Sequence, residues 1–304
     1  CAGAGLLYGA SPFVLTRLGV GHLALVAAVG ILPWAVPTLL RPSASGARTY
    51  LWALALACTG FFGGTLAVPA VLVGLACSPA PRRTGRTLGL LALSQAPWLV
   101  PGLVVLSRSA QPAASGDFRT DASGTGGVLR VLAGHGFWRW PSQVGDEQGW
   151  VVPLLGCALL VAAVVGARSL SGPERRAAPA LAAVGLIVPL ASALPLVRGA
   201  YSWAVDTPVS AALREGQRVL PLFLVVVAPA VAAGVTRLSS ARPGWLAGVV
   251  LAAPLAVALV LSGPGLWGVR GALDPVDIPE EWEEARAEIR AGGGTVLSLP
   301  FFQY

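Results

Sequence analysis

Long apolar stretches alternate with short polar loops along most of this chain. Six of these stretches approach the roughly 20 residues that a helix needs to cross the hydrocarbon core of a bilayer. The pattern therefore predicts an all-α integral membrane helix bundle with about six crossings. We expect these crossings at residues 20–40, 87–107, 150–167, 178–197, 220–236 and 245–262.

A seventh apolar stretch, residues 50–77, is interrupted in its middle by the sequence GFFGG at residues 60–64. Basic residues flank it on both sides, with Arg41 and Arg48 before it and Arg86 after it. A single crossing would place these two basic loops on opposite faces of the membrane, whereas the positive-inside rule favours one face for both. We therefore expect a broken hairpin here, either re-entrant or made of two short spans.

The distribution of charge sets the orientation. All 21 basic residues are Arg, and the expected cytoplasmic loops carry ten of them against one acid, while the outer segments carry eleven against thirteen acids. The inner side sums to +9 and the outer side to −2, which gives the net charge of +7. We expect a multi-pass protein of the plasma (cytoplasmic) membrane with its C-terminus outside. The outer segments are then residues 1–19, 108–149, 198–219 and all residues after 263.

The composition supports a membrane protein, because 55% of the residues are hydrophobic and only 12% are charged. The basic residues lie between spans rather than in one patch, which argues against nucleic-acid binding. The cysteines and histidines have no paired spacing, so neither a disulfide framework, a metal site nor a cofactor is expected. The chain has no Met and is interpreted as a fragment of a longer protein.

Two domains are expected. Residues 1–266 form the polytopic transmembrane domain, with its outer loop at 108–149. Residues 267–304 begin an extracytoplasmic soluble domain of α/β or β-rich type. In this tail, an acid-rich helix at residues 280–291 precedes a strand at residues 295–299, because acidic residues favour the first turns of a helix and the glycines after it end it.

The outer loop carries candidate ligand-binding residues. These are Asp117, Arg119 and Asp121, followed by Trp138 and Arg139. Arginine can pair with the phosphate of a polyprenyl phosphate sugar, and an indole ring can stack on the sugar or the lipid. The alternative is a Trp-rich interfacial belt with solvated charges.

A second group of candidates stands at the mouth of the span that starts at residue 220. It comprises Asp206, Arg214, Glu215 and Arg218. Helical spacing places Arg214 and Arg218 on one face, and we expect this pair to line an outer pocket and hold an anionic lipid phosphate. Snorkelling of these side chains to the interface is the alternative.

The N-terminal segment offers one further candidate for substrate binding, Arg17. Ser11 and Pro12 predict a helix start, with the Ser11 side chain as the cap and Pro12 at the first helical position. His22 follows Arg17 by five residues and falls on a different helical face, so the two are not treated as a catalytic pair.

Several short motifs are found together in one known group of proteins. They are SPFV at residues 11–14, LPW at 32–34, APWLVP at 96–101, REGQR at 214–218 and the tail from 278 to 304. With these motifs the chain resembles actinobacterial polytopic membrane proteins related to arabinofuranosyltransferases of the GT-C glycosyltransferase superfamily.

The resemblance implies transfer of a sugar, possibly arabinofuranose, from a polyprenyl-phosphate donor to a cell-envelope glycan on the outer face. Such enzymes carry their catalytic carboxylate in the first outer loop, which we expect to precede Cys1. No residue of this chain therefore inherits the catalytic role. A lipid or glycan transporter and a non-catalytic envelope scaffold are the alternatives.

Overall fold

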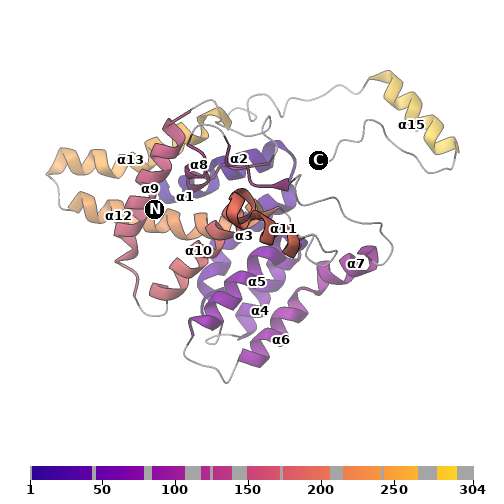
Figure 1. Ribbon diagram of the computed structural model, residues 1–304, viewed down its shortest axis with the longest axis horizontal. Coiled ribbons are helices and arrows are strands. Elements are labelled where there is room, and N and C mark those ends of the chain that lie inside the picture. The colour runs from indigo at the N-terminus through magenta and orange to yellow at the C-terminus, as the bar shows by residue number, and fades with distance from the viewer. Residues whose placement is uncertain are drawn as a thin grey trace.

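In a computed structural model of the chain, every regular element among the described residues is a helix, and the helices pack into a bundle (Figure 1). This confirms the all-α fold of residues 1–266 in outline. The structure describes residues 2–42, 46–78, 84–106, 118–123, 126–138, 149–171, 174–205, 215–240, 243–265 and 279–292.

The chain begins with two short helices, α1 (Ala2–Gly9) and α2 (Pro12–Gly19), followed by α3 (Leu23–Leu39). Helix α2 starts at Pro12, as predicted, but the Ser11 side chain makes no capping hydrogen bond, so that part of the prediction is wrong. Gly21 has a φ of 78°, a left-handed conformation that turns the chain between α2 and α3.

The apolar stretch at residues 50–77 forms two helices, α4 (Gly46–Ala57) and α5 (Phe61–Ala76), which break at Gly60 with a φ of 81°. They fold back as a hairpin. Near the break the Gly63 backbone packs against the Leu56 carbonyl, and near the other end Gly74 packs against the chain that precedes α4. The expectation that this stretch is not a single helix is confirmed.

The remaining helices complete the bundle. They are α6 (Thr84–Ser94), α7 (Ala96–Leu106), α8 (Leu129–Leu132), α9 (Val151–Ala167), α10 (Glu174–Ala193), α11 (Pro195–Val205), the 3-10 turn η6 (Gly216–Val219), α12 (Pro221–Ser240), α13 (Gly244–Ser262) and the 3-10 turn η7 (Gly263–Gly265).

Three helical segments among the described residues are long and apolar enough to cross a membrane: Arg175–Ala193, Gly216–Ser240 and Gly244–Ser262. A fourth follows if α6 and α7, which meet at an angle of 57°, count as one bent span. The apolar helices indicate a membrane protein, but the expected six crossings are not supported. Helices α3 and α9 have 17 residues each, which is about 25 Å of helix against the roughly 30 Å of a hydrocarbon core.

Helix α12 packs against α9 through small residues. The Gly234 backbone approaches the Ala162 carbonyl, and the Gly166 backbone approaches the Ala230 carbonyl, so closely that a side chain on either glycine would collide with them. Such close approach is typical of helix pairs in membranes, where small residues allow backbones to pack together.

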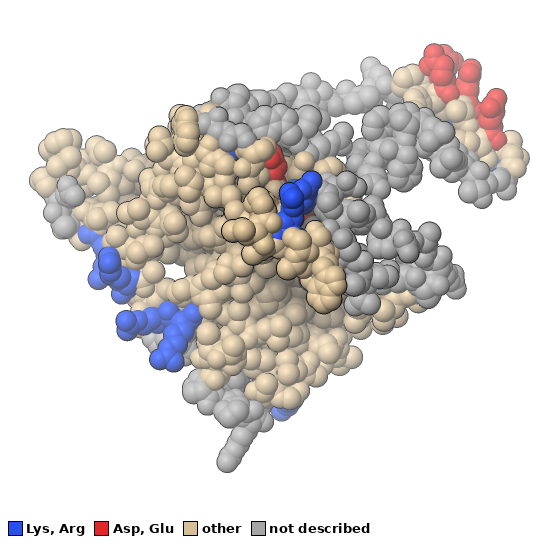
Figure 2. All heavy atoms as spheres, viewed as in Figure 1, with Lys and Arg blue, Asp and Glu red and all other residues tan. Residues whose placement is uncertain are grey.

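The two ends of α12 carry different charged groups. Glu215 and Arg218 precede its start, whereas Arg237 lies near its end and donates from Nη1 to Ser169 Oγ at 3.2 Å, next to the end of α9. Basic side chains gather at this second end (Figure 2). Arg218 and Arg237 therefore lie near opposite ends of the apolar segment Gly216–Ser240.

The predicted helix in the tail is present as α15 (Glu280–Gly292), with Glu280, Glu281 and Glu283 in its first turn and no buried residue. It stands apart from the bundle in Figure 1. The predicted strand at residues 295–299 lies outside the described residues. The expected α/β or β-rich domain is therefore not supported by the part of the tail that the structure describes, which is a single exposed helix.

Candidate functional site

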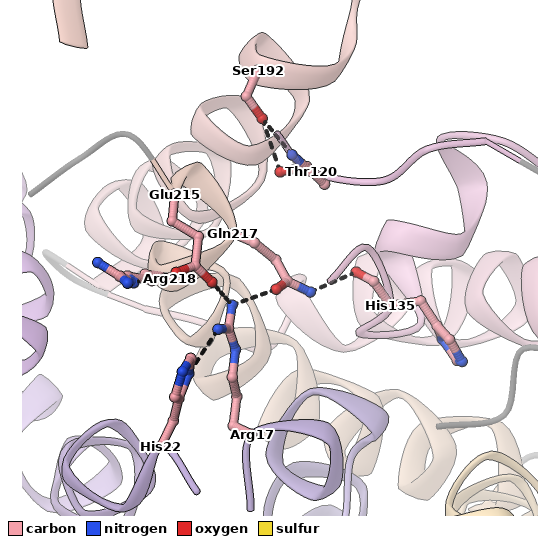
Figure 3. A network of polar contacts seen from close by, with 8 residues as sticks. All are labelled: Arg17, His22, Thr120, His135, Ser192, Glu215, Gln217 and Arg218. Atoms are coloured by element: carbon pink, nitrogen blue, oxygen red, sulfur yellow. Dashed lines mark hydrogen bonds and ion pairs between the residues drawn. The ribbon is translucent and has the colours of Figure 1, made fainter. Parts of the chain in front are cut away.

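Segments that are far apart in the sequence meet at one end of the bundle. They are the turn between α2 and α3, the segment at residues 118–138, and η6 with the residue before it. Figure 3 shows the polar contacts that join them. Two features result: a buried group of charged and polar residues, here called the ion cluster (Arg17, His22, Glu215, Gln217 and Arg218), and an open groove beside it.

Glu215 is the centre of the ion cluster. Its Oε1 forms an ion pair with Nη2 of Arg17, and its Oε2 lies 2.6 Å from Nε of Arg218. The side chains of Arg17 and Glu215 are 0% and 1% exposed, while that of Arg218 is 16% exposed. Burial alone would raise the pKa of Glu215, but the charges of Arg17 and then Arg218 outweigh it and lower that pKa. The carboxylate therefore stays ionised.

Arg17 also binds two neutral partners. Its Nη2 donates to Oε1 of Gln217 at 2.6 Å, and its Nη1 lies 3.0 Å from Nδ1 of His22. Because a guanidinium can only donate, Nδ1 of His22 must accept, so the ring is neutral and its proton is on Nε2. Burial, and then the charge of Arg17, lowers the pKa of His22 to about 4.

The contact between Arg17 and His22 corrects the expectation that the two side chains lie on different faces. That expectation assumed one continuous helix from residue 12 onwards. The structure ends α2 at Gly19, and the positive φ of Gly21 turns the chain back so that the His22 ring reaches the Arg17 guanidinium.

Aromatic rings enclose both arginines. The Arg17 Cζ lies 4.4 Å from the ring centroid of Phe137, and the Arg218 Cζ lies 4.8 Å and 5.0 Å from the ring centroids of Phe61 and Phe62. Phe61 and Phe62 form the tip of the α4–α5 hairpin, so this hairpin reaches from the ion cluster towards the other end of the bundle. Desolvated cation–π contacts of this kind contribute roughly 2 kcal/mol each.

Hydrogen bonds attach the segment at residues 118–138 to both neighbours. Gln217 Nε2 donates to the carbonyl of His135 at 3.2 Å. The Thr120 backbone N–H donates to Ser192 Oγ on α10 at 3.1 Å, and the two hydroxyls lie 2.9 Å apart. The ion cluster and α10 thus hold this segment in place, and its outer side forms one wall of the groove.

The groove has a volume of about 680 Å³ and brings together three of the predicted site residues, Arg119, Asp121 and Trp138. Its opposite wall runs from Ser192 at the end of α10 to Pro195 at the start of α11. The groove therefore combines a cation, a carboxylate and an indole at the end of an apolar helix. A cavity of this size lies within the range of small-molecule sites.

The polar groups of the groove are held in defined positions. Asp121 Oδ1 accepts a hydrogen bond from the Ser123 backbone N–H at 2.9 Å. The Trp138 ring meets Phe118 edge to face with centroids 5.0 Å apart, and its buried Nε1–H has no hydrogen-bond partner among the described residues. Arg119 is exposed. These groups can offer a charge, an acceptor and an aromatic ring to one ligand.

Behind the groove lies Arg130, which is 3% exposed. Burial lowers its pKa, and the negative charge of Asp121 opposes this effect. The roles of Gln217 and Ser192 could not be predicted from the sequence, because each residue bonds to partners that are distant in the chain. A small polar residue in an apolar helix, such as Ser192 on α10, is a signal that could have indicated the second of these roles.

The candidate residues are therefore divided. Arg17, Glu215 and Arg218 lie in the ion cluster, and Arg119, Asp121 and Trp138 line the groove. The other four lie outside the described residues, so their predicted roles stay predictions: Asp117, Arg139, Asp206 and Arg214.

We expected Arg218 to stand on an α-helix and to line an open pocket, but the structure differs. Arg218 belongs to a 3-10 turn, and its guanidinium is engaged by Glu215 and stacked on two phenylalanine rings. This arrangement suits a link between segments better than a lipid-phosphate site.

Comparison of the chain with protein-family models, with characterised proteins and with solved structures finds no match.

Proposed function

We propose that the groove binds the phosphate and sugar of a polyprenyl-phosphate sugar, and that the protein acts as a membrane glycosyltransferase. The observation that carries this proposal is the meeting of Arg119, Asp121 and Trp138 on one cavity of about 680 Å³ at the end of α10. The resemblance of the sequence to arabinofuranosyltransferases suggests the sugar, arabinofuranose, and the acceptor, a cell-envelope glycan.

Each of the three residues fits one part of such a donor. The planar guanidinium of Arg119 suits bidentate contact with a phosphate. The Trp138 ring, which lines the groove, offers an apolar face to the sugar. Asp121, whose orientation is fixed by Ser123, can accept hydrogen bonds from sugar hydroxyls.

In the transfer step, an oxygen of the acceptor glycan attacks the anomeric carbon of the donor sugar. The bond from that carbon to the phosphate oxygen breaks, and polyprenyl phosphate leaves with the electron pair. A carboxylate takes the proton of the acceptor hydroxyl. Arg119 would stabilise the charge that develops on the departing phosphate.

The proton acceptor is not assigned to any described residue. Both carboxylate oxygens of Glu215 are in ion pairs within a buried cluster, so this residue is unsuited to the task. Asp121 is placed to orient the sugar, and it enters the proposal as a binding residue.

The binding step can be tested with the chain in lipid nanodiscs, titrated with a short-chain polyprenyl monophosphate. We expect Arg119→Ala to weaken binding by roughly ten- to a hundredfold, because a hydrogen bond to a charged group contributes about 1.5 to 3 kcal/mol. Arg168→Ala is the matched control, since Arg168 is also exposed but follows α9 at the other end of the bundle. Equal effects of the two substitutions would contradict the proposal.

Transfer is tested separately, in membranes that contain the full-length protein and a radiolabelled polyprenyl-phosphate sugar. Labelled glycan that depends on Arg119 supports the glycosyltransferase. Intact binding without labelled glycan would instead favour a transporter or a binding scaffold.

A further inference from the structure

Helix α11 lies across the same end of the bundle as the groove. It starts at Pro195, directly after α10 ends, and its Tyr201 hydroxyl lies 2.9 Å from the position that a Cβ on Gly216 would occupy. Gly216 begins the apolar segment Gly216–Ser240. Helix α11 thus connects the end of one candidate span with the start of another, and it runs along the end of the bundle.

The two sides of α11 differ. Val205 is buried and Tyr201 is half-buried, which defines the side that packs on the bundle. On the other side, the side chain of Leu196 is 98% exposed and that of Trp203 is 83% exposed. These two residues are seven positions apart, which is two helical turns, so they share one face.

The length and surroundings of α11 identify what covers this face. A helix of 11 residues is about 16 Å long, too short to cross a bilayer. The exposed Ile187 belongs to the candidate span Arg175–Ala193, and the exposed Leu194 follows the end of α10 and leads directly to Leu196. Arg198 is also exposed, and helical spacing places it roughly 160° around α11 from Leu196, outside the face that Leu196 and Trp203 share.

We propose that α11 is an interfacial helix that binds the phospholipid surface of the bilayer. Leu196 and Trp203 insert at the boundary between head groups and acyl chains, and Arg198 contacts the head groups. Tryptophan is the side chain best suited to this boundary, because it combines a large apolar ring with one polar N–H.

The position of α11 also determines how the groove lies relative to the bilayer. Leu194 and Pro195, where α10 passes into α11, form part of the groove wall. An interfacial α11 sets the groove at the level of the lipid head groups, so a ligand with a lipid tail can enter it from the bilayer. The lipid contact itself does not depend on which ligand the groove binds.

Spin labels on single cysteines test the proposal. The four native cysteines are replaced by serine, and labels are placed at Leu196→Cys, Trp203→Cys and Arg198→Cys in the chain reconstituted into phospholipid vesicles. Collision rates are measured with oxygen, which concentrates in lipid, and with a water-soluble nickel chelate. No polyprenyl phosphate is present, so the outcome is separate from that of the ligand-binding test.

We expect the ratio of oxygen to nickel collisions at positions 196 and 203 to exceed that at position 198 by roughly threefold or more, since the apolar face of an interfacial helix is immersed in lipid. Equal ratios at the three positions would show that the helix stands in water and would overturn the proposal. Protection of 196 and 203 from both reagents, with dipolar broadening between labels, would show that a second copy of the chain covers the face instead.

A second measurement keeps the native cysteines. Lipids with brominated acyl chains quench tryptophans that lie in the bilayer, and Trp203→Phe should remove part of this quenching. If the quenched fraction is the same with and without Trp203, the proposal is wrong.

Discussion

The ion cluster and the groove lie at the same end of the bundle, and residues 118–138 contact the first and line the second. The charged residues of the two features differ in burial and in pairing. In the ion cluster, each charge of Arg17 and Glu215 is buried and meets a partner from another segment. In the groove, Arg119 is exposed and Asp121 is fixed mainly by its own loop. A buried charge at a membrane boundary is tolerated where it is fully paired. An exposed one lies where a ligand in the groove can reach it.

The largest test of this difference is the removal of one arginine from each feature. We expect Arg17→Ala to destabilise the detergent-solubilised protein by about 3 to 5 kcal/mol, the usual cost of breaking a buried ion pair. The substitution leaves acceptor atoms of Glu215, Gln217 and His22 without their donor. Thermal unfolding followed by circular dichroism measures the change.

Arg119→Ala serves as the control for this experiment. An exposed arginine in the groove should change the stability by no more than roughly 0.5 kcal/mol. If the two substitutions shift the melting temperature equally, the ion cluster does not hold the segments together as described.

A smaller effect is expected where the groove segment is attached to α10. Ser192→Ala removes the acceptor of the Thr120 backbone N–H and the neighbour of its hydroxyl, all of which are buried. Leaving such groups unpaired costs roughly 1 to 3 kcal/mol. Because Thr120 also borders the groove, we expect weaker binding of polyprenyl phosphate in the same variant.

Ser240→Ala is the matched control, since the Ser240 hydroxyl donates to the Arg237 carbonyl at an exposed position on α12. It should leave both stability and binding unchanged. If Ser192→Ala lowers the stability without weakening binding, the hydrogen bonds between Thr120 and Ser192 stabilise the fold but do not shape the groove.

The smallest effect concerns pH. The pKa of His22 is about 4 in the folded protein and near 6.5 in the unfolded chain, so the unfolded state takes up a proton first as the pH falls. Stability is therefore fully present above pH 6.5 and is lost progressively towards pH 4. At this half-buried site, solvent screening limits the loss to on the order of 1 kcal/mol.

Denaturant titrations at several pH values, with His22→Gln alongside, check this expectation. The neutral glutamine can still accept from Arg17 but cannot take up a proton, so its stability should vary less between pH 6.5 and pH 4. A slope identical to that of the unsubstituted protein would assign the pH dependence to another group. Glu215 contributes little in the upper part of this window, because its carboxylate is ionised in both the folded and the unfolded chain. The two arginines lower its pKa in the folded protein, so its own contribution to stability is lost only from about pH 5 downwards, where the unfolded carboxylate takes up a proton.

Local signals in the sequence predicted local structure well. The start of α2 at Pro12, the break in the stretch at residues 50–77 and the helix α15 all follow from Pro, Gly and acidic residues at defined positions. The number of crossings did not follow, because hydropathy does not reveal where an apolar segment bends, as it does between α6 and α7, or ends after 17 residues.

The candidate site was predicted by residue type but not by arrangement. The sequence marked Arg119, Asp121 and Trp138, which do share a groove. Arg17 and Glu215 were predicted as separate candidates, although they form one ion pair. Two residues 198 positions apart in the chain leave no periodic pattern that would show that they pair. Helical spacing gave the wrong face for His22, because Gly21 turns the chain before this residue.

The hydrogen bond between Arg17 and Gln217 joins residues 200 positions apart. At a synthesis rate of about 5 to 20 residues per second, the ribosome adds this length in roughly 10 to 40 seconds. Throughout that interval the Arg17 guanidinium has neither its carboxylate nor its amide partner, so it must remain hydrated or be held by the insertion machinery. The contacts of Arg17 with Glu215 and Gln217 can therefore form only after the turn before α12 has emerged, so this part of the assembly is completed late in synthesis although Arg17 is made early.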